Sequence, residues 1–570
     1  MPSLPETKGT DADSRAWLRR LGAAMIVCAL LLGAVIAFCH LGFETNDDIA
    51  VLKLAAGLYD GHPGEFLVLM NVIPGLLLKG LYGHVPHVPW YEILLLTVHF
   101  LALSLLLFVL FLRRFSWRTL LLFVSFFLTF ELVILCRMSY TTTGSLAALA
   151  GVLLAVAAFS TEKLLPRTVF AIMGGVLVVA AGLLRGHSFA LVLLLAVPLL
   201  LGVERRLRLR VWMTIGLASV VTLGLLLYSQ RVNVAAGWGD SYELNRCRFA
   251  LQNFSRLIFN EKTRPYYQEV GWDGQDVDAF RHYFSYDSRV FATTTLTHLA
   301  DRVPVSRPAG EVIGIIRDNL SYHKFTLLFA AAVVTLVLLR TDRKSRWIMI
   351  LTAGWSVVMF LGLASTAKPA FRVVHTLILF NAGVAIFLLS AFSRLQTVRE
   401  RAVSALRRRT EIALVAVLVA GALVQGYRMM KESERTRVRG RQFEEFVSVV
   451  RRLGPDAIVV PYSGTPSLPL FVDLDLLNNP RSIPGGCLIN SPVYHTVMRN
   501  LGMTEVHEAL LQRERCYLVV GARTDDHLRE HLPPFFKRHY GVDISFQTVA
   551  RTGDRIIYRL ISSSPSGTMP

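Results

Sequence analysis

Long apolar blocks separated by short polar loops dominate the sequence. Each block has close to the ~20 residues that cross a ~30 Å hydrocarbon layer as an α-helix. The blocks do not alternate apolar with polar residues, as half-buried soluble elements do. We therefore predict a polytopic α-helical membrane protein with about 11 transmembrane helices, near 21–39, 91–112, 119–136, 143–160, 168–185, 188–203, 211–229, 324–340, 346–365, 372–392 and 411–428.

The first block resembles a secretory signal peptide, because it follows Arg15, Arg19 and Arg20. It is long for such a peptide, and no small-x-small cleavage site follows it. We interpret it as an uncleaved first span with a cytoplasmic N-terminus.

A further segment, 66–82, is apolar but short, and it carries Asn71, Pro74 and Lys79. Loop charge decides whether it spans, because cytoplasmic loops are enriched in Lys and Arg. If it does not span, the cytoplasmic N-terminus and short loops hold 23 Lys and Arg, against six in the short stretches opposite. If it spanned, this asymmetry would reverse. We therefore predict that 41–90 is one outer-face loop with two membrane-parallel helices, near 47–59 and 66–82.

Composition supports the membrane class. Hydrophobic residues make up 53% of the 570 residues and charged residues 18%, which excludes a disordered chain, and six cysteines are too few for a disulfide scaffold. The net charge of +19 arises mainly in the loops between apolar blocks. Membrane orientation explains this charge better than a nucleic-acid partner does.

Two longer polar regions, 230–323 and 430–570, fall on the outer side in this topology. The second predicts a separate α/β domain, whose expected elements are a helix at 442–453, strands at 457–461 and 516–520, a helix at 526–539 and a hairpin of 544–549 with 555–560. We therefore predict a transmembrane domain, 1–429, and a periplasmic or extracellular α/β domain, 430–570. The latter contains no phosphate-binding glycine loop or nucleophile elbow, so we expect docking or acceptor handling there rather than chemistry.

Polar residues that could carry chemistry collect at the outer ends of the spans. Asp47 and Asp48 follow the first span closely, and the cations near other span ends are Arg137, Arg185, Lys368 and Arg372. Two adjacent carboxylates repel, which raises the pKa of one and suits it to act as a general base. Arg and Lys at the bilayer surface suit a phosphate leaving group. The combination indicates transfer of a group from a lipid phosphate.

This arrangement resembles the GT-C superfamily of integral-membrane glycosyltransferases, which use polyprenyl-phosphate-linked sugars. The resemblance rests on Asn46-Asp47-Asp48 after span one, on the stretch Leu58-Tyr59-Asp60-Gly61-His62-Pro63 with the helix after it, and on the domain after the last span. It implies that Asp47 is the catalytic base and that Asp48 is a supporting acceptor or metal ligand. The Lys-Pro-Pro-like segment that some members carry in the first loop is missing.

Simpler explanations compete with these roles. Asn46 or Asp47 could cap a helix that begins near residue 49, and the outer arginines could extend to lipid headgroups. His62, Glu65, His187 and His375 are candidate substrate-binding residues. A divalent metal is possible but no cofactor is certain, because the histidines and acids of the first loop match no standard metal motif.

We predict a glycosyltransferase of the bacterial inner (plasma) membrane. It would transfer a sugar from a polyprenyl-phosphate donor to a cell-envelope glycan, lipid or protein acceptor on the outer face. The alternatives are a transporter or flippase of lipid-linked saccharides and a structural subunit of an envelope assembly complex. A transporter would be expected to show repeat symmetry and ionisable residues along a path on both membrane sides.

Overall fold

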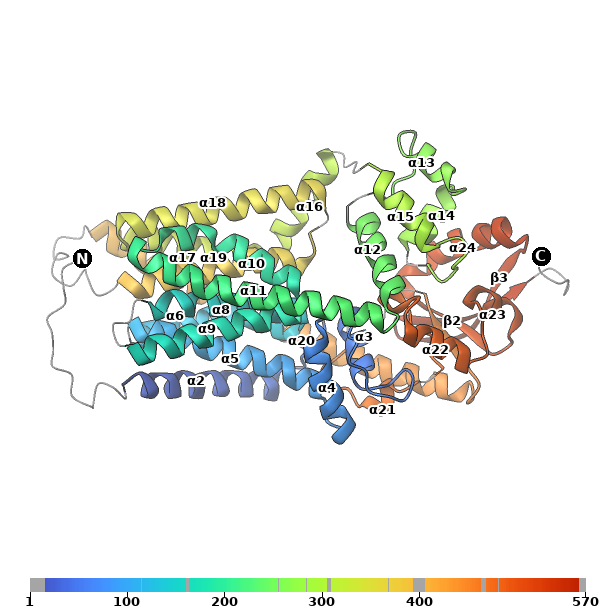
Figure 1. The fold of residues 1–570 in the computed structure, drawn as a ribbon, viewed down its shortest axis with the longest axis horizontal. Helices are drawn as coiled ribbons and strands as arrows, with labels where there is room; N and C mark the ends of the chain where they lie inside the picture. The colour runs from blue at the N-terminus through green and yellow to red at the C-terminus, as the bar shows by residue number, and fades with distance from the viewer. Residues whose placement is uncertain are drawn as a thin grey trace.

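The computed structural model describes residues 16–562, with gaps at 114, 160–163, 255, 283, 305–308, 368, 393–404, 463–467 and 480. Figure 1 shows a bundle of long helices and, at one end of it, a smaller domain that contains a four-stranded sheet. We call the end of the bundle beside this domain the sheet end and the opposite end the far end.

The predicted polytopic helical fold is confirmed. Within the described residues, nine helices are long and apolar enough to cross a membrane, α16 and α17 together would add a tenth, and α10 is a shorter apolar helix. All eleven predicted spans coincide with bundle helices, which are α2 (Ala16–Phe38), α5 (Trp90–Arg113), α6 (Trp117–Phe126) continued by η1 (Phe127–Glu131) and α7 (Leu132–Cys136), α8 (Tyr140–Ala158), α9 (Leu164–Leu184), α10 (Gly186–Gly202), α11 (Arg205–Ala235), α17 (Lys324–Arg340), α18 (Arg343–Thr366), α19 (Phe371–Phe392) and α20 (Ala405–Arg452).

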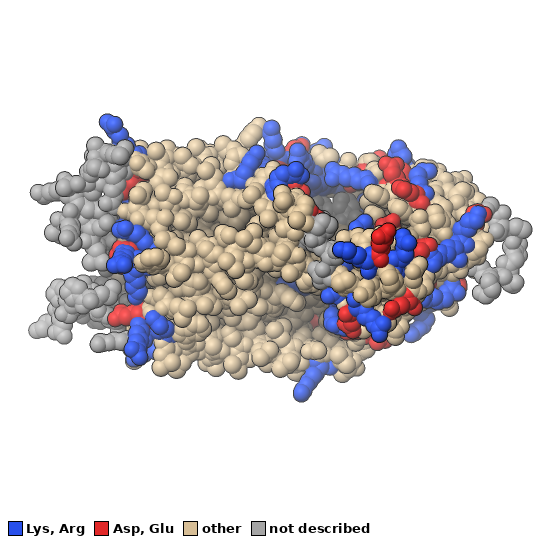
Figure 2. Space-filling model, turned by 90° about the horizontal axis from the view of Figure 1, so that it is seen from above, with Lys and Arg blue, Asp and Glu red and all other residues tan. Residues whose placement is uncertain are grey.

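Charged side chains gather at the two ends of the bundle and on the sheet domain. On the face shown in Figure 2, a belt of uncharged surface separates the charges at the far end from those at the sheet end and on the sheet domain. Large apolar side chains are exposed on the bundle helices, as at Leu30 (68%), Leu217 (67%) and Val358 (59%). Such a surface is expected where helices face hydrocarbon rather than water.

Helix α8 lies at the centre of the bundle, and every one of its residues is buried. It meets α9 through glycines: a Cβ added to Gly151 would lie 2.7 Å from the carbonyl oxygen of Gly174, and one added to Gly174 would lie 2.8 Å from that of Gly151. The two backbones therefore touch, as in other membrane helix pairs with small interface residues. This contact helps to position Tyr140, the first residue of α8, at the sheet end.

We expect Gly151→Val to separate α8 from α9 and destabilise the bundle by about 1–3 kcal/mol, the usual effect of overpacking. The matched control is Gly175→Val, because a Cβ on Gly175 has no neighbour within 4 Å. Thermal denaturation of the detergent-solubilised protein measures both. Equal melting temperatures for the two variants would contradict the close packing.

The first loop contains the two predicted short helices, α3 (Asn46–Ala55) and α4 (Val72–His84). At 1.5 Å per residue, the 13 residues of α4 extend about 20 Å, too short to cross the hydrocarbon layer. The predicted start at residue 66 is wrong. Asn71 is the N-cap, and its side chain accepts a hydrogen bond from the Ile73 N–H, so the helix begins only after it.

The sheet has the strand order β1-β2-β4-β3. β1 (Ile458–Pro461) is parallel to β2 (Cys516–Gly521), and β4 (Arg555–Ser562) is antiparallel to both β2 and β3 (Ile544–Thr552). The strands, the hairpin and the preceding helix α24 (Asp525–Tyr540) lie within a few residues of their predicted positions.

Both faces of the sheet are covered. One face packs on the hydrophobic core that includes the bundle and the end of α20, through Val459, Val519 and Ile557. The other face packs on a second core, through the neighbouring residues Val460 and Leu518. This division follows from the alternation of side chains along a strand. The second core also contains apolar residues between 244 and 303, from α12 (Gly239–Asn253), α13 (Arg264–Glu269), α14 (Gly274–Arg281) and α15 (Thr293–Arg302). Much of the predicted outer loop 230–323 thus packs on the sheet, and α16 (Ala309–Tyr322) leads from it into α17.

Helix α20 joins the bundle to the sheet domain as one 48-residue helix. The predicted last span and the predicted helix 442–453 are parts of it. Near its end, the guanidinium of Arg555 lies over the rings of Phe443 and Phe446, at 5.2 and 4.4 Å. The boundary predicted at 429/430 falls inside this continuous helix, so the division into 1–429 and 430–570 stays a prediction.

Candidate active site at the sheet end

The segment after α2 is fixed by backbone pairing with two distant parts of the chain. Gly42 bridges Pro469 of the sheet domain, and Phe43 bridges Met138 between α7 and α8. The Glu44 N–H donates to the Met138 carbonyl at 2.8 Å. These bonds place the acids of residues 44–48 beside Arg137, although about 90 residues separate the two segments in the chain.

Helix α3 begins at Asn46, with Thr45 in the N-cap position. The expectation that Asn46 or Asp47 caps a helix beginning near residue 49 is therefore wrong, because Asp47 and Asp48 lie in the first turn. There, negative charge is favoured by the helix dipole. The Thr45 side chain makes no capping bond and instead donates to Asp48 Oδ2 at 2.7 Å.

Asp48 is completely buried and accepts three hydrogen bonds. Besides Thr45, the hydroxyl of Tyr91 (2.9 Å) and the backbone N–H of Tyr140 (3.1 Å) donate to its Oδ1. Burial raises the pKa of Asp48 to about 6, against the lowering effect of these three bonds. Asp48 thereby connects the first turn of α3 to the ends of α5 and α8, which suits a positioning role.

Asp47 is half-buried, and no hydrogen bond or ion pair of its carboxylate is found among the described residues. The turn η2 (Gly486–Leu488) of the sheet domain lies near it. Burial raises the pKa of the Cys487 thiol to about 12, and the negative charge of Asp47 adds to the rise. Asn245 holds this turn by donating to the Cys487 carbonyl at 2.7 Å. Asp47 thus has an available carboxylate between the bundle and the sheet domain.

Glu44 is a member of this cluster that the sequence analysis did not select. Its Oε2 is buried without a hydrogen-bond partner in the structure. Burial raises the pKa of Glu44 to about 7; the positive charges of Arg372 and Arg137 oppose the rise, and Asp48 and Asp47 contribute to it. Its place immediately after the first span was the only signal in the sequence.

Two of the predicted cations face the acids. Arg372, at the start of α19, is half-buried, and its field acts on Glu44 without an ion pair among the described residues. Arg185, the N-cap residue of α10, lies over the Tyr140 ring at 5.4 Å and donates to the Leu69 carbonyl at 3.3 Å. The charges of Arg185, Arg372 and Asp47 all act on the Tyr140 hydroxyl, so the three residues surround it, and the phosphate-binding role of the two arginines stays a prediction.

Arg137 is held more tightly. It forms an ion pair of 3.2 Å with Glu432 of α20 and lies over the rings of Tyr322 and Phe371, at 5.3 and 5.7 Å. It therefore connects α7 to α20, and its phosphate-binding role stays a prediction. Lys368, the fourth predicted cation, lies outside the described residues.

A basic groove opens near Arg137, between the bend of α16 and α17 and the middle of α20. It has a volume of about 590 Å³, and its lining includes Lys324, Arg428, Lys431 and Asp318. These cations were not among the site residues predicted from the sequence. Tyr322 and Arg428 also line a small inner cavity together with Phe371 and His375. Arg137 lies over Tyr322, which lines both, and over Phe371, which lines the cavity, so the groove and the cavity are adjacent to Arg137.

The structure does not bring the predicted substrate-binding residues together as one group. Glu65 forms an ion pair with Lys79 of α4 at 2.7 Å, and His62 is exposed. His187 is exposed next to Arg185, whereas His375 is buried in the inner cavity beside Phe371. His187 and His375 therefore remain near the predicted cations. Among the described residues, no side-chain contact links His62 or Glu65 to the acid pair.

The acid pair does not form a ready metal site. Both oxygens of Asp48 are already engaged by hydrogen-bond donors inside the protein, which makes the predicted metal-ligand role for Asp48 a poor fit. In the described part of the chain, the group of His, Cys, Asp and Glu residues spaced for a metal lies elsewhere, on α24.

A buried polar group within the bundle also escaped the sequence analysis. His99 of α5 lies 2.5 Å from Glu131, the last residue of the π-helical turn η1, and its other ring nitrogen lies 2.8 Å from Thr143 Oγ1. Thr143 is in the first turn of α8, beside Tyr140. Ionisable residues inside membrane helices are rare and usually paired, so a His and a Glu within apolar spans were the available signal.

No protein-family model matches the chain, and no curated protein matches it. Two solved structures of ArnT from Cupriavidus metallidurans are similar to it. The structure bound to undecaprenyl phosphate is 12% identical, with a TM-score of 0.47, over 95% of this chain and 98% of that one. The apo structure is 14% identical, with a TM-score of 0.42, over 96% and 98%.

The structure itself establishes the architecture. It confirms three features that the resemblance to GT-C enzymes implies: two short helices in the first loop, an acid pair at the start of the first of them, and an α/β domain after the last span. The chain is a polytopic helical membrane protein in which acids and arginines from separate segments meet at the sheet end of the spans.

Proposed function

We propose that the protein is a membrane glycosyltransferase that uses a polyprenyl-phosphate-linked sugar as donor. The observation that carries this proposal is the state of Asp47, which is half-buried and whose carboxylate has no partner among the described residues. It stands beside Asp48, whose carboxylate is fully hydrogen-bonded. Arg372 and Arg185 belong to the same group of side chains. The site lies at the end of apolar spans, where a lipid phosphate resides. We further propose that the sheet end faces the periplasm or the cell exterior.

In this mechanism, an acceptor hydroxyl of a glycan, lipid or protein attacks the anomeric carbon of the donor sugar. Asp47 takes the hydroxyl proton as the new carbon–oxygen bond forms. The bond from the anomeric carbon to the phosphate oxygen breaks, and polyprenyl phosphate leaves with the electron pair. Arg372 and Arg185 stabilise the negative charge that grows on the phosphate.

The basic groove supplies a route for the donor. Neither Lys324 nor Lys431 forms an ion pair with a carboxylate in the described part of the chain, and each lies over an aromatic ring, Phe325 at 5.2 Å and Tyr427 at 4.9 Å. Amines beside aromatic rings suit the membrane interface, where they attract lipid phosphates. The phosphate would enter along the groove and pass Arg428 and Arg137 toward Arg372.

The proposal is tested with the purified full-length chain in proteoliposomes, supplied with a panel of radiolabelled polyprenyl-phosphate sugars and acceptor extracts. Transfer of label to an acceptor, lost in Asp47→Asn, supports it. Movement of labelled saccharide across the vesicle membrane without transfer would instead establish the transporter alternative. If neither activity occurs with any donor, the proposed function is wrong.

Replacing Lys324 and Lys431 by Ala should raise the KM for the donor, by about fivefold per lysine, because each attracts an anionic headgroup at the membrane surface. The value of kcat should stay within about twofold, since neither lysine contacts the acids. Lys344→Ala, an exposed lysine at the far end, is the matched control. An unchanged KM in the double variant would remove the groove from the donor route.

The raised pKa of Glu44, about 7, predicts a pH effect on donor binding. A carboxyl with this pKa is neutral at about pH 6 and ionised at about pH 8, so rising pH adds a negative charge near Arg372 and Arg137. We expect the KM for the donor to increase about five- to tenfold between about pH 6 and 8, a change of ~1 kcal/mol between partly buried charges.

Glu44→Gln should abolish most of that pH dependence and keep the low-pH KM throughout. Glu434→Gln, an exposed acid of α20, serves as the control. If Glu44→Gln retains the wild-type slope of KM against pH, another group is responsible.

A further inference from the structure

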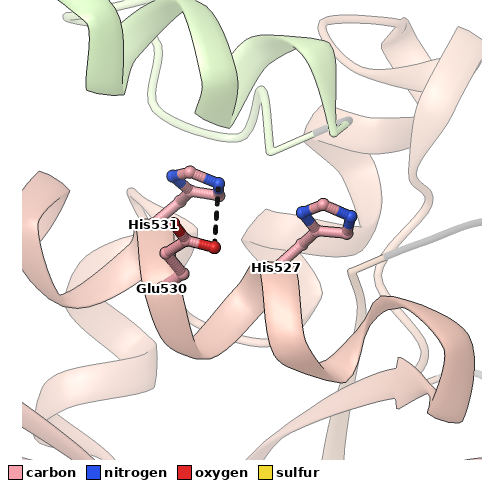
Figure 3. Close-up of side chains that lie close together, drawn as sticks. All are labelled: His527, Glu530 and His531. Atoms are coloured by element: carbon pink, nitrogen blue, oxygen red, sulfur yellow. Dashed lines mark ion pairs between the residues drawn. The ribbon is translucent and has the colours of Figure 1, made fainter.

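Three histidines meet in the sheet domain, away from the acid cluster. His527 and His531 stand one turn apart on α24, with Glu530 between them in the sequence, and Figure 3 shows all three side chains on the same stretch of helix. One potential ligand atom from each of these three residues lies within 4.8 Å of the other two. His282, the C-cap residue of α14, adds a third imidazole from a segment about 245 residues earlier in the chain.

The spacing of the rings suits a shared metal ion. The ring centres of His282 and His527 are 4.5 Å apart, those of His282 and His531 5.7 Å, and those of His527 and His531 6.0 Å. Two imidazoles on one tetrahedral Zn²⁺, with Zn–N bonds of ~2.0–2.1 Å, have ring centres roughly 5 Å apart. The rings lie nearly parallel, at interplanar angles of 10–22°. They must therefore rotate about their side-chain bonds to converge on an ion.

Hydrogen bonds select the nitrogen that each of two rings offers. His282 Nδ1 donates to the carbonyl of Asp278 at 2.8 Å, and His531 Nδ1 donates to Gln275 Oε1 at 3.2 Å. Each bond leaves Nε2 as the nitrogen available to a metal, and His531 Nε2 lies 3.9 Å from Glu530 Oε2, the ion pair marked in Figure 3. Metal-bound histidines typically donate their other N–H to an oxygen in this way. Both oxygens come from α14, so one short helix orients ligands on both sides of the interface.

The interface that carries the histidines is held by other contacts. His539 of α24 bonds to the buried Asp276 of α14 at 2.6 Å, and Arg538 forms ion pairs with Asp273 and Asp276. Ligands on two docked helices are better positioned than ligands on free loops. His527 and Glu530 are exposed and His531 is partly buried, so an ion can enter from solvent.

We propose that His282, His527 and His531 bind a divalent transition-metal ion of the Zn²⁺ type, with Glu530 or water as the fourth ligand. Three neutral imidazoles with an oxygen donor suit Zn²⁺ in tetrahedral geometry. The bound ion would cross-link α14 to α24 and so fasten the segment that covers the sheet. The site is independent of the proposed transfer reaction, and no step of that reaction passes through it.

The test uses the full-length chain, purified without a histidine tag, stripped with a chelator and titrated with Zn²⁺ against a chromophoric competitor. Wild type should bind one more ion with high affinity than the variant His282→Ala/His527→Ala/His531→Ala. Each single Ala variant should bind that ion about tenfold or more weakly, because losing only a hydrogen-bonding partner of a metal ligand already weakens binding by about 10–100-fold. His298→Ala, which removes a partly exposed histidine paired with Glu269, is the matched control and should bind like wild type. Equal stoichiometry and affinity in wild type and the triple variant would overturn the site.

A second measurement tests the cross-link itself. Zn²⁺ should raise the melting temperature of wild type, because a ligand that binds only the folded state stabilises it, and this increase should be lost in His282→Ala. If His282→Ala keeps both the affinity and the thermal shift, the three-histidine site is wrong. Co²⁺ should give the absorption bands of a tetrahedral nitrogen site in wild type only, whereas octahedral spectra would contradict the assigned geometry. Neither readout depends on sugar transfer, so failure here leaves the proposed function standing.

Discussion

Asp47→Asn should lower kcat for sugar transfer by about 10²–10⁴-fold, the usual contribution of a general base. The amide keeps the size of the side chain but cannot take a proton from the acceptor hydroxyl. The carboxylate of Asp47 makes no hydrogen bond or ion pair with the described residues, so the variant should fold like wild type. Single-turnover transfer in proteoliposomes at saturating donor measures the effect.

The informative comparison is with Asp48→Asn. Asp48 has the raised pKa, about 6, that would suit a base. Its oxygens, however, already accept bonds from Thr45, Tyr91 and Tyr140, and it is fully buried, so an acceptor cannot reach it easily. Asp48→Asn should lower stability as well as activity. Asp60→Asn, at a half-exposed acid in the same loop, should alter neither. Full activity of the Asp47→Asn protein would mean that the base is Asp48 or Glu44 rather than Asp47.

Arg372→Gln should reduce kcat/KM for the donor by about 10²–10³-fold, as loss of one strong donor to a developing negative charge does. Its charge acts on Glu44, and its removal leaves the acids at the start of α3 with less positive charge nearby. Steady-state kinetics with varied donor give the loss, and Arg372→Lys should recover part of it. Arg343→Gln, an exposed arginine at the far end, is the matched control.

The pH profile separates an electrostatic role for Arg372 from a structural one. Arg372 lowers the pKa of Glu44 against the effect of burial. Its removal should therefore move the midpoint of the KM–pH curve above about 7. A loss of activity without a shift of that midpoint would indicate that Arg372 only supports the packing of α19.

The histidine site illustrates what local patterns can reveal. His527 and His531, four residues apart on a predicted helix, share one helix face, and this was visible in the sequence. The third ligand, His282, stands far earlier in the chain, in a region that was predicted only as an outer loop. No spacing rule connects the two segments, because they meet through tertiary contacts: a shared hydrophobic core and the polar contacts of His539 and Arg538 with Asp276.

The acids and arginines at the sheet end show the same division. The position of Asp47 and Asp48 after the first span indicated their importance. Arg185 and Arg372 were selected because a charged residue at the end of a membrane span is costly and usually has a function. Glu44, Tyr91 and Tyr140 were missed because their importance depends on burial and on contacts between α3, α5 and α8. Arg428 and the groove were missed because the bend of 77° between α16 and α17 does not follow from hydropathy.

The spans, the short helices of the first loop and the strands of the sheet domain could all be predicted from the sequence alone. These features follow from hydrophobic length and from periods of about 3.6 and 2 residues, which are local properties of the chain. Three features became visible only in the folded chain: α20 continues into the sheet domain, residues 244–303 pack on the sheet, and Arg137 pairs with Glu432. Each of these depends on contacts between residues far apart in the chain, and such contacts form only when helices and strands pack to bury their apolar faces together.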